Sequence, residues 1–257
     1  MRCTLPLALT FLTVLPWWRL GQVGPQDLAR SMLWFPWVGL ILGLGFWAGL
    51  WVFQVFSPPL AAALLLTLTV LATRGLHLDG LADTVDGLGG GQTPPARLAI
   101  MKDSRLGAFG AMSLFLALLL KFTLFLAFAG KTAAPAGLIL FPVLSRWGMV
   151  LLAFLSPYAR PEGGLGQAMT TGVTGETLVG ATGGALFLAF LISGTPGLLL
   201  MAAGAAAVWL LSIYFQKKLG GVTGDVLGAA NEVLEILALG GLLLLPSGPA
   251  ISSLQFF

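Results

Sequence analysis

The stretch "SMLWFPWVGLILGLGFWAGLWVFQVF", residues 31–56, decides the class of fold, because it carries no charged side chain over a length sufficient to cross a bilayer. A transmembrane helix needs ~20 mainly apolar residues. The whole chain shares this character: 57% of its 257 residues are apolar, 9% are charged, and the mean hydropathy is +0.95. This composition excludes a soluble domain and predicts one integral membrane domain over residues 1–257.

Six further apolar segments predict an all-α integral membrane protein with about seven transmembrane helices. The preceding segment 5–19 is too short to cross, and Pro16 and two tryptophans follow where a signal peptide would have small residues. We expect it to form an interfacial or re-entrant helix. The further spans are 60–76, 107–129, 134–156, 177–193, 196–215 and 227–245, and the small residues expected to allow close helix approach are Gly39, Gly43, Gly204 and Gly240.

The distribution of charge predicts the orientation of the bundle. The expected external loops 57–59 and 193–197 carry no charge, and Lys131 is the one cation expected on that side. By the positive-inside rule the N-terminus is therefore expected in the cytoplasm. Carboxylates are likewise expected near the cytoplasmic face and not at mid-membrane, which favours surface chemistry over ion-coupled transport. The 13 Lys and Arg residues are scattered among the spans, so the sequence does not indicate a nucleic-acid partner.

Three aspartates and the single histidine of the chain lie in "HLDGLADTVDGLGGG", residues 77–91. In a helix, Asp79, Asp83 and Asp86 would lie within about 60° of one another on one face. Their mutual repulsion destabilises a helix, and a divalent cation would relieve it. Carboxylate oxygens suit Mg²⁺. The alternative is a solvated acidic helix end whose first-turn acids complement the helix dipole.

Glycines and cations follow this helix. We expect Gly89 and Gly90 to end it and to let the backbone approach a phosphate, with a plain flexible turn as the alternative. In "IMKDSRLGAFG", residues 100–110, Lys102 and Arg105 stand one turn apart. Cations at this spacing are expected to clamp phosphates, Arg105 through a bidentate contact. The alternative is that they anchor the next span at the membrane surface.

A third polar stretch, "LGGVTGDVLGAANEVLE" at residues 219–235, opens the last span. Thr223 is expected to cap the helix, which places Asp225 in its first turn. Glu232 follows seven residues later on the same face. An aspartate at a helix start ordinarily complements the helix dipole, whereas Glu232, a turn or two into a membrane helix, requires a partner.

Taken together, these three stretches resemble the signature segments of the cobalamin synthase family, the adenosylcobinamide-GDP ribazoletransferases. The N-terminal "FLTVLPWW" (11–18) and "WFPWVGLILG" (34–43) resemble the start of that family. Residues 157–180 match no family motif, which leaves Glu162 and Glu176 without an inherited role.

The resemblance implies a Mg²⁺-dependent phosphotransferase of cobalamin biosynthesis in the cell (inner) membrane, with its active site facing the cytoplasm. A ribose hydroxyl of α-ribazole, or of its 5′-phosphate, attacks the phosphate attached to cobinamide in adenosylcobinamide-GDP, and GMP leaves. His77 is the candidate acceptor of the hydroxyl proton, although it could instead orient a loop or a carboxylate while an aspartate acts as the base. Implied catalytic residues are His77, Asp83 and Asp86; implied diphosphate-binding residues are Lys102, Arg105, Gly89 and Gly90; implied metal ligands are Asp79, Asp83, Asp86, Asp225 and Glu232.

Other classes of membrane protein stay open at this point. A prenyltransferase uses aspartate-rich helix ends with Mg²⁺, but ordinarily two such clusters, and residues 219–235 offer one Asp and two Glu. A CDP-alcohol phosphotransferase requires an arginine where this chain has Asp83. A transporter is the non-enzymatic alternative. The expected surroundings of the protein are the lipid bilayer, and assembly into a homo-oligomer is a further possibility that the sequence leaves open.

Overall fold

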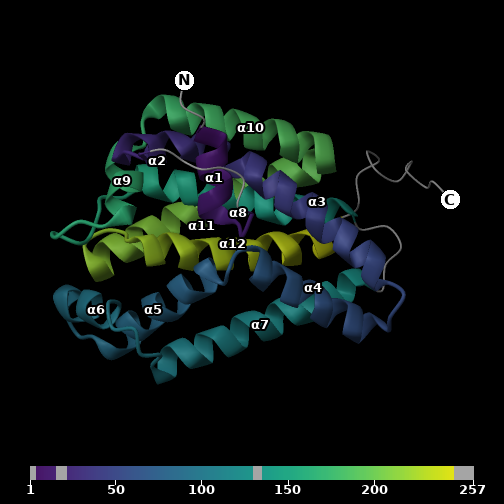
Figure 1. The fold of residues 1–257 in the computed structure, drawn as a ribbon, viewed down its shortest axis with the longest axis horizontal. Helices are drawn as coiled ribbons and strands as arrows, with labels where there is room; N and C mark the ends of the chain where they lie inside the picture. Colours follow the sequence, from purple (N-terminus) through teal and green to yellow (C-terminus); the bar gives the residue numbers. More distant parts are fainter. Residues whose placement is uncertain (1–3, 16–21, 130–134, 246–257) are drawn as a thin grey trace.

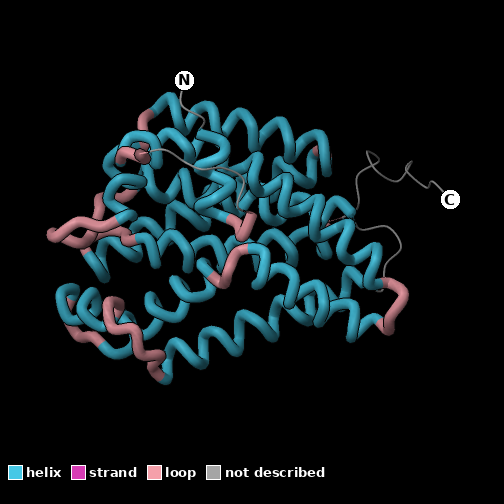
Figure 2. Tube along the Cα trace, viewed as in Figure 1, coloured by secondary structure: helices cyan, strands magenta, loops and turns pink. Residues whose placement is uncertain are grey.

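The computed structural model describes residues 4–15, 22–129 and 135–245, and nearly all of them are helical (Figures 1 and 2). No strand occurs among these residues, and the one extended pairing is an isolated bridge between Tyr158 and Val222. The helices are α1 (Thr4–Leu12), α2 (Pro25–Ser31), the 3₁₀ turn η1 (Met32–Trp34), α3 (Phe35–Phe53), α4 (Pro58–Ala72), α5 (Leu76–Gly90), α6 (Pro94–Ile100), α7 (Ala108–Ala129), α8 (Pro135–Leu155), α9 (Leu165–Gly172), α10 (Gly175–Ser193), α11 (Thr195–Leu219) and α12 (Gly224–Leu244).

Within the described residues, six helical segments are long and apolar enough to cross a membrane. A seventh is reached if α4 and α5, which meet at an angle of 85°, count as one broken span. The all-helical membrane fold predicted from the sequence is confirmed. The six segments are Pro25–Phe53, Ala108–Ala129, Ala136–Leu155, Gly175–Ser193, Thr195–Leu219 and Gly224–Leu244.

The predicted span at residues 60–76 corresponds to α4 (15 residues), which is long enough to cross a membrane only together with α5. α4 ends at Ala72, and Arg74 (φ 55°) and Gly75 (φ 67°) adopt left-handed backbone conformations that turn the chain. The Arg74 guanidinium donates hydrogen bonds to the carbonyl oxygens of Thr10 (2.8 Å) and Thr13 (2.7 Å) at the end of α1. A cation at a helix C-terminus is stabilising, so the bend and the short N-terminal helix support each other. The tryptophan pair expected to anchor that helix, at positions 17 and 18, lies outside the described residues.

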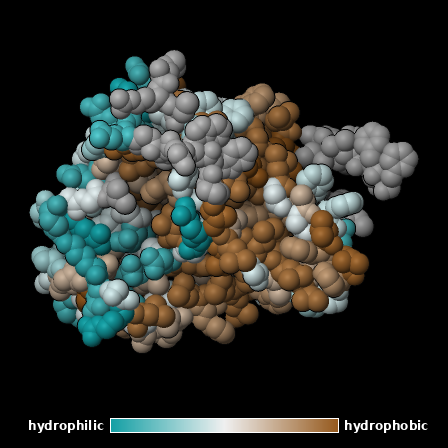
Figure 3. Space-filling view, viewed as in Figure 1, coloured by the Kyte–Doolittle hydropathy of each residue, from teal (hydrophilic) through white to brown (hydrophobic). Residues whose placement is uncertain are grey.

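The bundle is built around α8, with α3 and α12 packed against it (Figure 1). One end of the molecule, where α2, α6 and α9 lie, is hydrophilic, and the greater part of the visible surface is apolar (Figure 3). We call this hydrophilic end the polar end. The separation is typical of a protein whose sides face lipid and whose polar residues gather at one membrane surface.

Glycines allow the closest helix contacts of the bundle. A Cβ atom added at Gly39 or Gly43 would lie 2.4 Å and 2.3 Å, respectively, from carbonyl oxygens of α8. These contacts confirm the prediction for both glycines, because only a residue without a side chain fits there. The same prediction is wrong for Gly204 and Gly240, where an added Cβ would meet its nearest neighbour at 3.8 Å and 4.0 Å, an ordinary contact distance.

Replacing Gly43 by alanine should destabilise the bundle, because overpacking a close contact costs about 1–3 kcal/mol. Gly45→Ala is the matched control: it lies in the same helix, and an added Cβ there has no neighbour within 4 Å. It should leave the protein as stable as the unmodified chain, or stabilise it by up to about 1 kcal/mol through helix propensity. Thermal unfolding in detergent measures both variants. Equal melting temperatures for the two would contradict the assigned packing of α3 on α8.

Candidate active site

α5 crosses α12 at a pair of glycines, and this contact brings two of the three polar stretches together. A Cβ at Gly80 would lie 2.7 Å from the carbonyl oxygen of Asp225, and one at Gly228 would lie 3.3 Å from Cα of His77. α12 begins as predicted, with the Thr223 hydroxyl accepting a hydrogen bond from the backbone N–H of Val226 at 3.3 Å. The aspartate stretch and the start of the last helix therefore share one small volume.

A cavity of about 290 Å³ lies at this crossing. Its walls come from α1, α5, α8, the beginning of α12, and residues 158–169, which connect α8 to α9 and include the first part of α9. Polar groups converge on an otherwise apolar pocket, which is the usual construction of a small-molecule site. The polar residues of the lining are His77, Asp79, Tyr158, Arg160 and Asp225.

The segment 157–160 contributes an arginine that the sequence motifs did not indicate. A guanidinium nitrogen of Arg160 lies 2.7 Å from Oδ2 of Asp225. Two backbone hydrogen bonds of 2.9 Å, from Ala159 to Val222 and from Val222 to Pro157, hold the segment beside the start of α12. In the sequence, Arg160 is only one of several cations expected on the cytoplasmic side. The sequence analysis therefore did not identify it as a site residue.

The three aspartates of α5 lie in different environments. Asp79 is exposed and lines the cavity, Asp83 is half-buried, and Asp86 is buried. Asp83 is repelled by the carboxylates of Asp79, Asp225 and Asp86 and attracted by Arg160. Among the described residues, no group of three or more His, Cys, Asp or Glu side chains stands close enough to hold a metal ion by itself.

Asp86 makes its contacts with the second polar stretch. Its two carboxylate oxygens accept hydrogen bonds from the backbone N–H groups of Gly107 (2.8 Å) and Gly110 (2.7 Å), where α7 begins. A Cβ on either glycine would collide with this carboxylate. A carboxylate on the free N–H groups of a helix start is stabilising, so the structure gives Asp86 and the glycines a shared structural task.

The two cations expected to clamp phosphates lie outside the cavity lining. Lys102 forms an ion pair with Glu162. Arg105 is 87% exposed and pairs with Asp103 at 2.5 Å, and these hydrogen bonds lower the pKa of Asp103 to about 2. The Lys102–Glu162 pair joins the second polar stretch to the loop that carries Arg160. Glu162 thereby acquires a contact that the sequence did not assign to it.

Gly89 and Gly90 lie at the C-terminal end of α5. An added Cβ at Gly89 would lie 2.5 Å from the ring of Phe109, and one at Gly90 would lie 3.1 Å from Ile100. Their small size thus serves helix packing around α5. Neither glycine lines the cavity.

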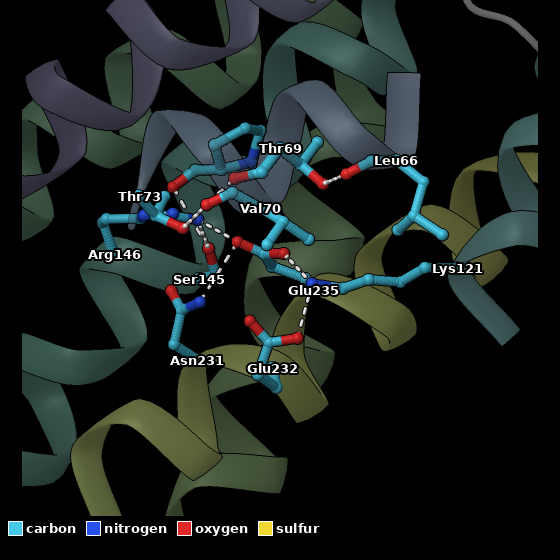
Figure 4. A network of polar contacts seen from close by, with 11 residues as sticks. Leu66, Thr69, Val70, Thr73, Lys121, Ser145, Arg146, Asn231, Glu232 and Glu235 are labelled. Atoms are coloured by element: carbon cyan, nitrogen blue, oxygen red, sulfur yellow. Dashed lines mark hydrogen bonds and ion pairs between the residues drawn. The ribbon is translucent and has the colours of Figure 1, made fainter. Parts of the chain in front are cut away.

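Glu232 lies about 10 Å further along α12 than Asp225 and belongs to a separate buried group. Lys121 of α7 lies 2.5 Å from both Glu232 and Glu235, and Arg146 of α8 also pairs with Glu235 (Figure 4). We call these four residues the internal charge cluster. The expectation that mid-membrane positions carry no carboxylates is therefore wrong, because Glu232 and Glu235 are buried in the middle part of a membrane helix.

His77 stands between the cavity and the internal charge cluster. It lines the cavity of about 290 Å³ and also a small polar void beside Lys121, Arg146 and the two glutamates. Its side chain is 1% exposed, and neither ring nitrogen has a hydrogen-bond partner among the described residues. A buried polar group without a partner is costly, so these nitrogens are free to meet a bound molecule or water.

The fold and the site define a polytopic helical membrane protein with a carboxylate- and arginine-lined cavity at one surface. The chain belongs to the family described as Cobalamin-5-phosphate synthase, whose model matches residues 4–243. It is 44% identical to the adenosylcobinamide-GDP ribazoletransferase of Syntrophobacter fumaroxidans over 90% of this chain and 94% of that protein. It is 42% identical to the enzyme of the same name from Pseudomonas putida strain W619, over 93% and 97% of the two chains. No solved structure matches the chain.

Replacing Asp86 by asparagine should destabilise the fold by about 1–3 kcal/mol, because an amide N–H₂ would then face a backbone N–H donor. The control is Asp79→Asn, which changes the same charge at an exposed position of the same helix. Thermal unfolding in detergent without added divalent ions measures both. If Asp86→Asn unfolds at the temperature of the unmodified protein, the helix-capping role is refuted.

Proposed function

We propose that this protein is an adenosylcobinamide-GDP ribazoletransferase that acts in the cavity between α5 and α12. The observation that carries the proposal is the convergence of His77, Asp79, Arg160 and Asp225 on one cavity in a chain of this family. A cavity of about 290 Å³ has room for the reacting phosphates and a ribose. The corrin ring is too large for it and would lie outside, toward the polar end.

The reaction is a displacement at phosphorus. The ribose hydroxyl oxygen of α-ribazole, or of its 5′-phosphate, forms a bond to the phosphorus attached to cobinamide, and the anhydride bond to GMP breaks. The hydroxyl proton passes to a base, for which an Asp79 carboxylate oxygen and a ring nitrogen of His77 are the candidates in the cavity lining. The protein contributes mainly by positioning the two substrates and neutralising phosphate charge.

The carboxylates of Asp79, Asp83 and Asp225 would hold Mg²⁺. An all-oxygen donor set suits this ion, and the repulsion that these groups exert on Asp83 is a reason to bind a cation there. Because no three carboxylates stand close enough together among the described residues, the substrate phosphates would complete the coordination. The bound ion would supply charge neutralisation at the phosphates. Asp86 and Glu232, with their own hydrogen-bonded partners, are left out of this ligand set.

Purified protein supplied with adenosylcobinamide-GDP, α-ribazole and Mg²⁺ should release GMP. Asp83→Asn and Asp225→Asn should each lower kcat at least about 100-fold while the protein stays folded, because each removes a charged ligand at nearly constant volume. The double variant should lose little more, since residues that act as a unit are strongly non-additive.

Raised Mg²⁺ should partly restore the two single variants. The control is Asp103→Asn, which removes a carboxylate from an exposed pair with Arg105. Glu232→Gln is unsuitable as a control, because it would leave the internal charge cluster with an unbalanced charge. Losses that multiply in the double variant and do not respond to Mg²⁺ would contradict a shared ion. Absence of GMP release from the unmodified protein would contradict the proposed reaction itself.

The polar end is proposed to face the cytoplasm. The exposed loop between α5 and α6 belongs to this end, whereas the loop 54–57 between α3 and α4 lies at the opposite one (Figures 1 and 2). With Cys3 replaced, Gln92→Cys in intact cells should resist an impermeant thiol reagent, and Ser57→Cys should react. The reverse pattern would overturn the orientation.

A further inference from the structure

Arg160 has features that an ion pair with Asp225 does not explain. Its side chain is 15% exposed and lines the cavity, yet its Nε atom is buried without a hydrogen-bond partner among the described residues. Its second contact, to the carbonyl oxygen of Met101, is long at 3.5 Å. A guanidinium offers five N–H donors in a planar fork, and the donor at Nε is available to a ligand.

A second residue of the cavity lining, His77, also has polar atoms without hydrogen-bond partners among the described residues. His77 presents two unpartnered ring nitrogens and is 1% exposed. The Nε atom of Arg160 and the two ring nitrogens of His77 have no hydrogen-bond partner among the described residues, and both residues line one cavity. These atoms point to a ligand that brings hydrogen-bonding atoms with it. The oxygens of a diphosphate match a guanidinium fork, because such pairs form short, charge-assisted and often bidentate hydrogen bonds.

We propose that Arg160 is the phosphate-binding arginine of the cavity and that Asp225 is its counter-ion only while no substrate is bound. This inference rests on the proposed function. When the diphosphate of adenosylcobinamide-GDP enters, the Arg160 guanidinium exchanges the Asp225 carboxylate for phosphate oxygens. Asp225 is thereby released toward Asp79 and Asp83, where it is needed for the cation. The exchange couples binding of the nucleotide-activated substrate to completion of the carboxylate site.

The exchange of partners by Arg160 requires movement of its side chain only, because the backbone beside it is held in place. The backbone of residues 157–159 is held by its pairing with Val222, and Tyr158 donates a hydrogen bond to the carbonyl oxygen of Gly163 at 3.2 Å. Gly221, at φ 156°, approaches Pro157 so closely that a Cβ would lie 2.3 Å from its carbonyl oxygen. With the loop fixed in this way, a change of side-chain rotamer is enough to move the guanidinium between its two partners.

The test measures binding without metal, so that it does not depend on turnover. The full-length protein in detergent with EDTA is titrated with adenosylcobinamide-GDP, and bound corrinoid is measured by equilibrium dialysis. Arg160→Ala should raise the Kd roughly tenfold or more, and Arg160→Lys should fall between it and the unmodified protein, because the charge is kept and the fork is lost. Asp225→Asn should lower the Kd several-fold, since it removes a competing carboxylate from Arg160.

Arg30→Ala, which removes an exposed cation at the polar end away from the cavity lining, is the control and should leave the Kd unchanged. If Arg30→Ala weakens binding as much as Arg160→Ala, general attraction by surface charge replaces the specific contact. If Asp225→Asn weakens binding as much as Arg160→Ala, the ion pair is purely structural and the exchange is refuted. GMP release by the unmodified protein, together with normal binding by a folded Arg160→Ala variant, would refute this inference while leaving the proposed function intact.

Discussion

Charges inside an apolar bundle must neutralise one another, and the position of α12 depends on this constraint. Lys121, Arg146, Glu232 and Glu235 come from three helices and are almost fully buried. Removing one partner from such a group leaves an uncompensated charge and is strongly destabilising, by about 3–5 kcal/mol. The cluster therefore fixes α12 against α7 and α8 along its length and in rotation. Asp225, two turns nearer the polar end, inherits its position from that arrangement.

The contact between α5 and α12 at Gly80 and Gly228 then places the functional residues of the two helices beside each other. Because Gly80 and Gly228 let the two backbones touch, Asp79 of α5 and Asp225 of α12 line one cavity. Asp86 performs the corresponding task for α7 by binding its N-terminal N–H groups. Of the polar residues in the three sequence stretches, Asp86 holds helices together, whereas Asp79 and Asp225 line the cavity.

Composition and hydropathy were sufficient to predict the six long spans, because the requirement for about twenty apolar residues acts on local sequence alone. The cap at Thr223 was predictable for the same reason: it depends on three neighbouring residues. The bend at Arg74 was not, because it depends on the left-handed backbone conformations of Arg74 and Gly75, about which hydropathy carries no information. The sequence also did not predict that Glu232 pairs with Lys121, 111 residues away, or that Asp225 pairs with Arg160, 65 residues away. Pairing over such separations is decided by helix packing. The spacing of Asp79, Asp83 and Asp86 predicted that they share a helix face. It did not predict that the Asp86 carboxylate accepts hydrogen bonds from the N–H groups of Gly107 and Gly110.

The internal charge cluster also imposes an order on the synthesis of the protein. Lys121 and Arg146 are made well before the carboxylates that neutralise them, since Glu232 and Glu235 follow Lys121 by 111 and 114 residues. At a synthesis rate of roughly 5–20 residues per second, Lys121 waits on the order of 5–20 seconds for its partners. During this interval α7 and α8 each contain an unpaired cation that hydrocarbon does not solvate. Insertion of the last helix is therefore the event that closes the bundle, and a nascent chain stopped before α12 would expose these helices to quality-control proteases.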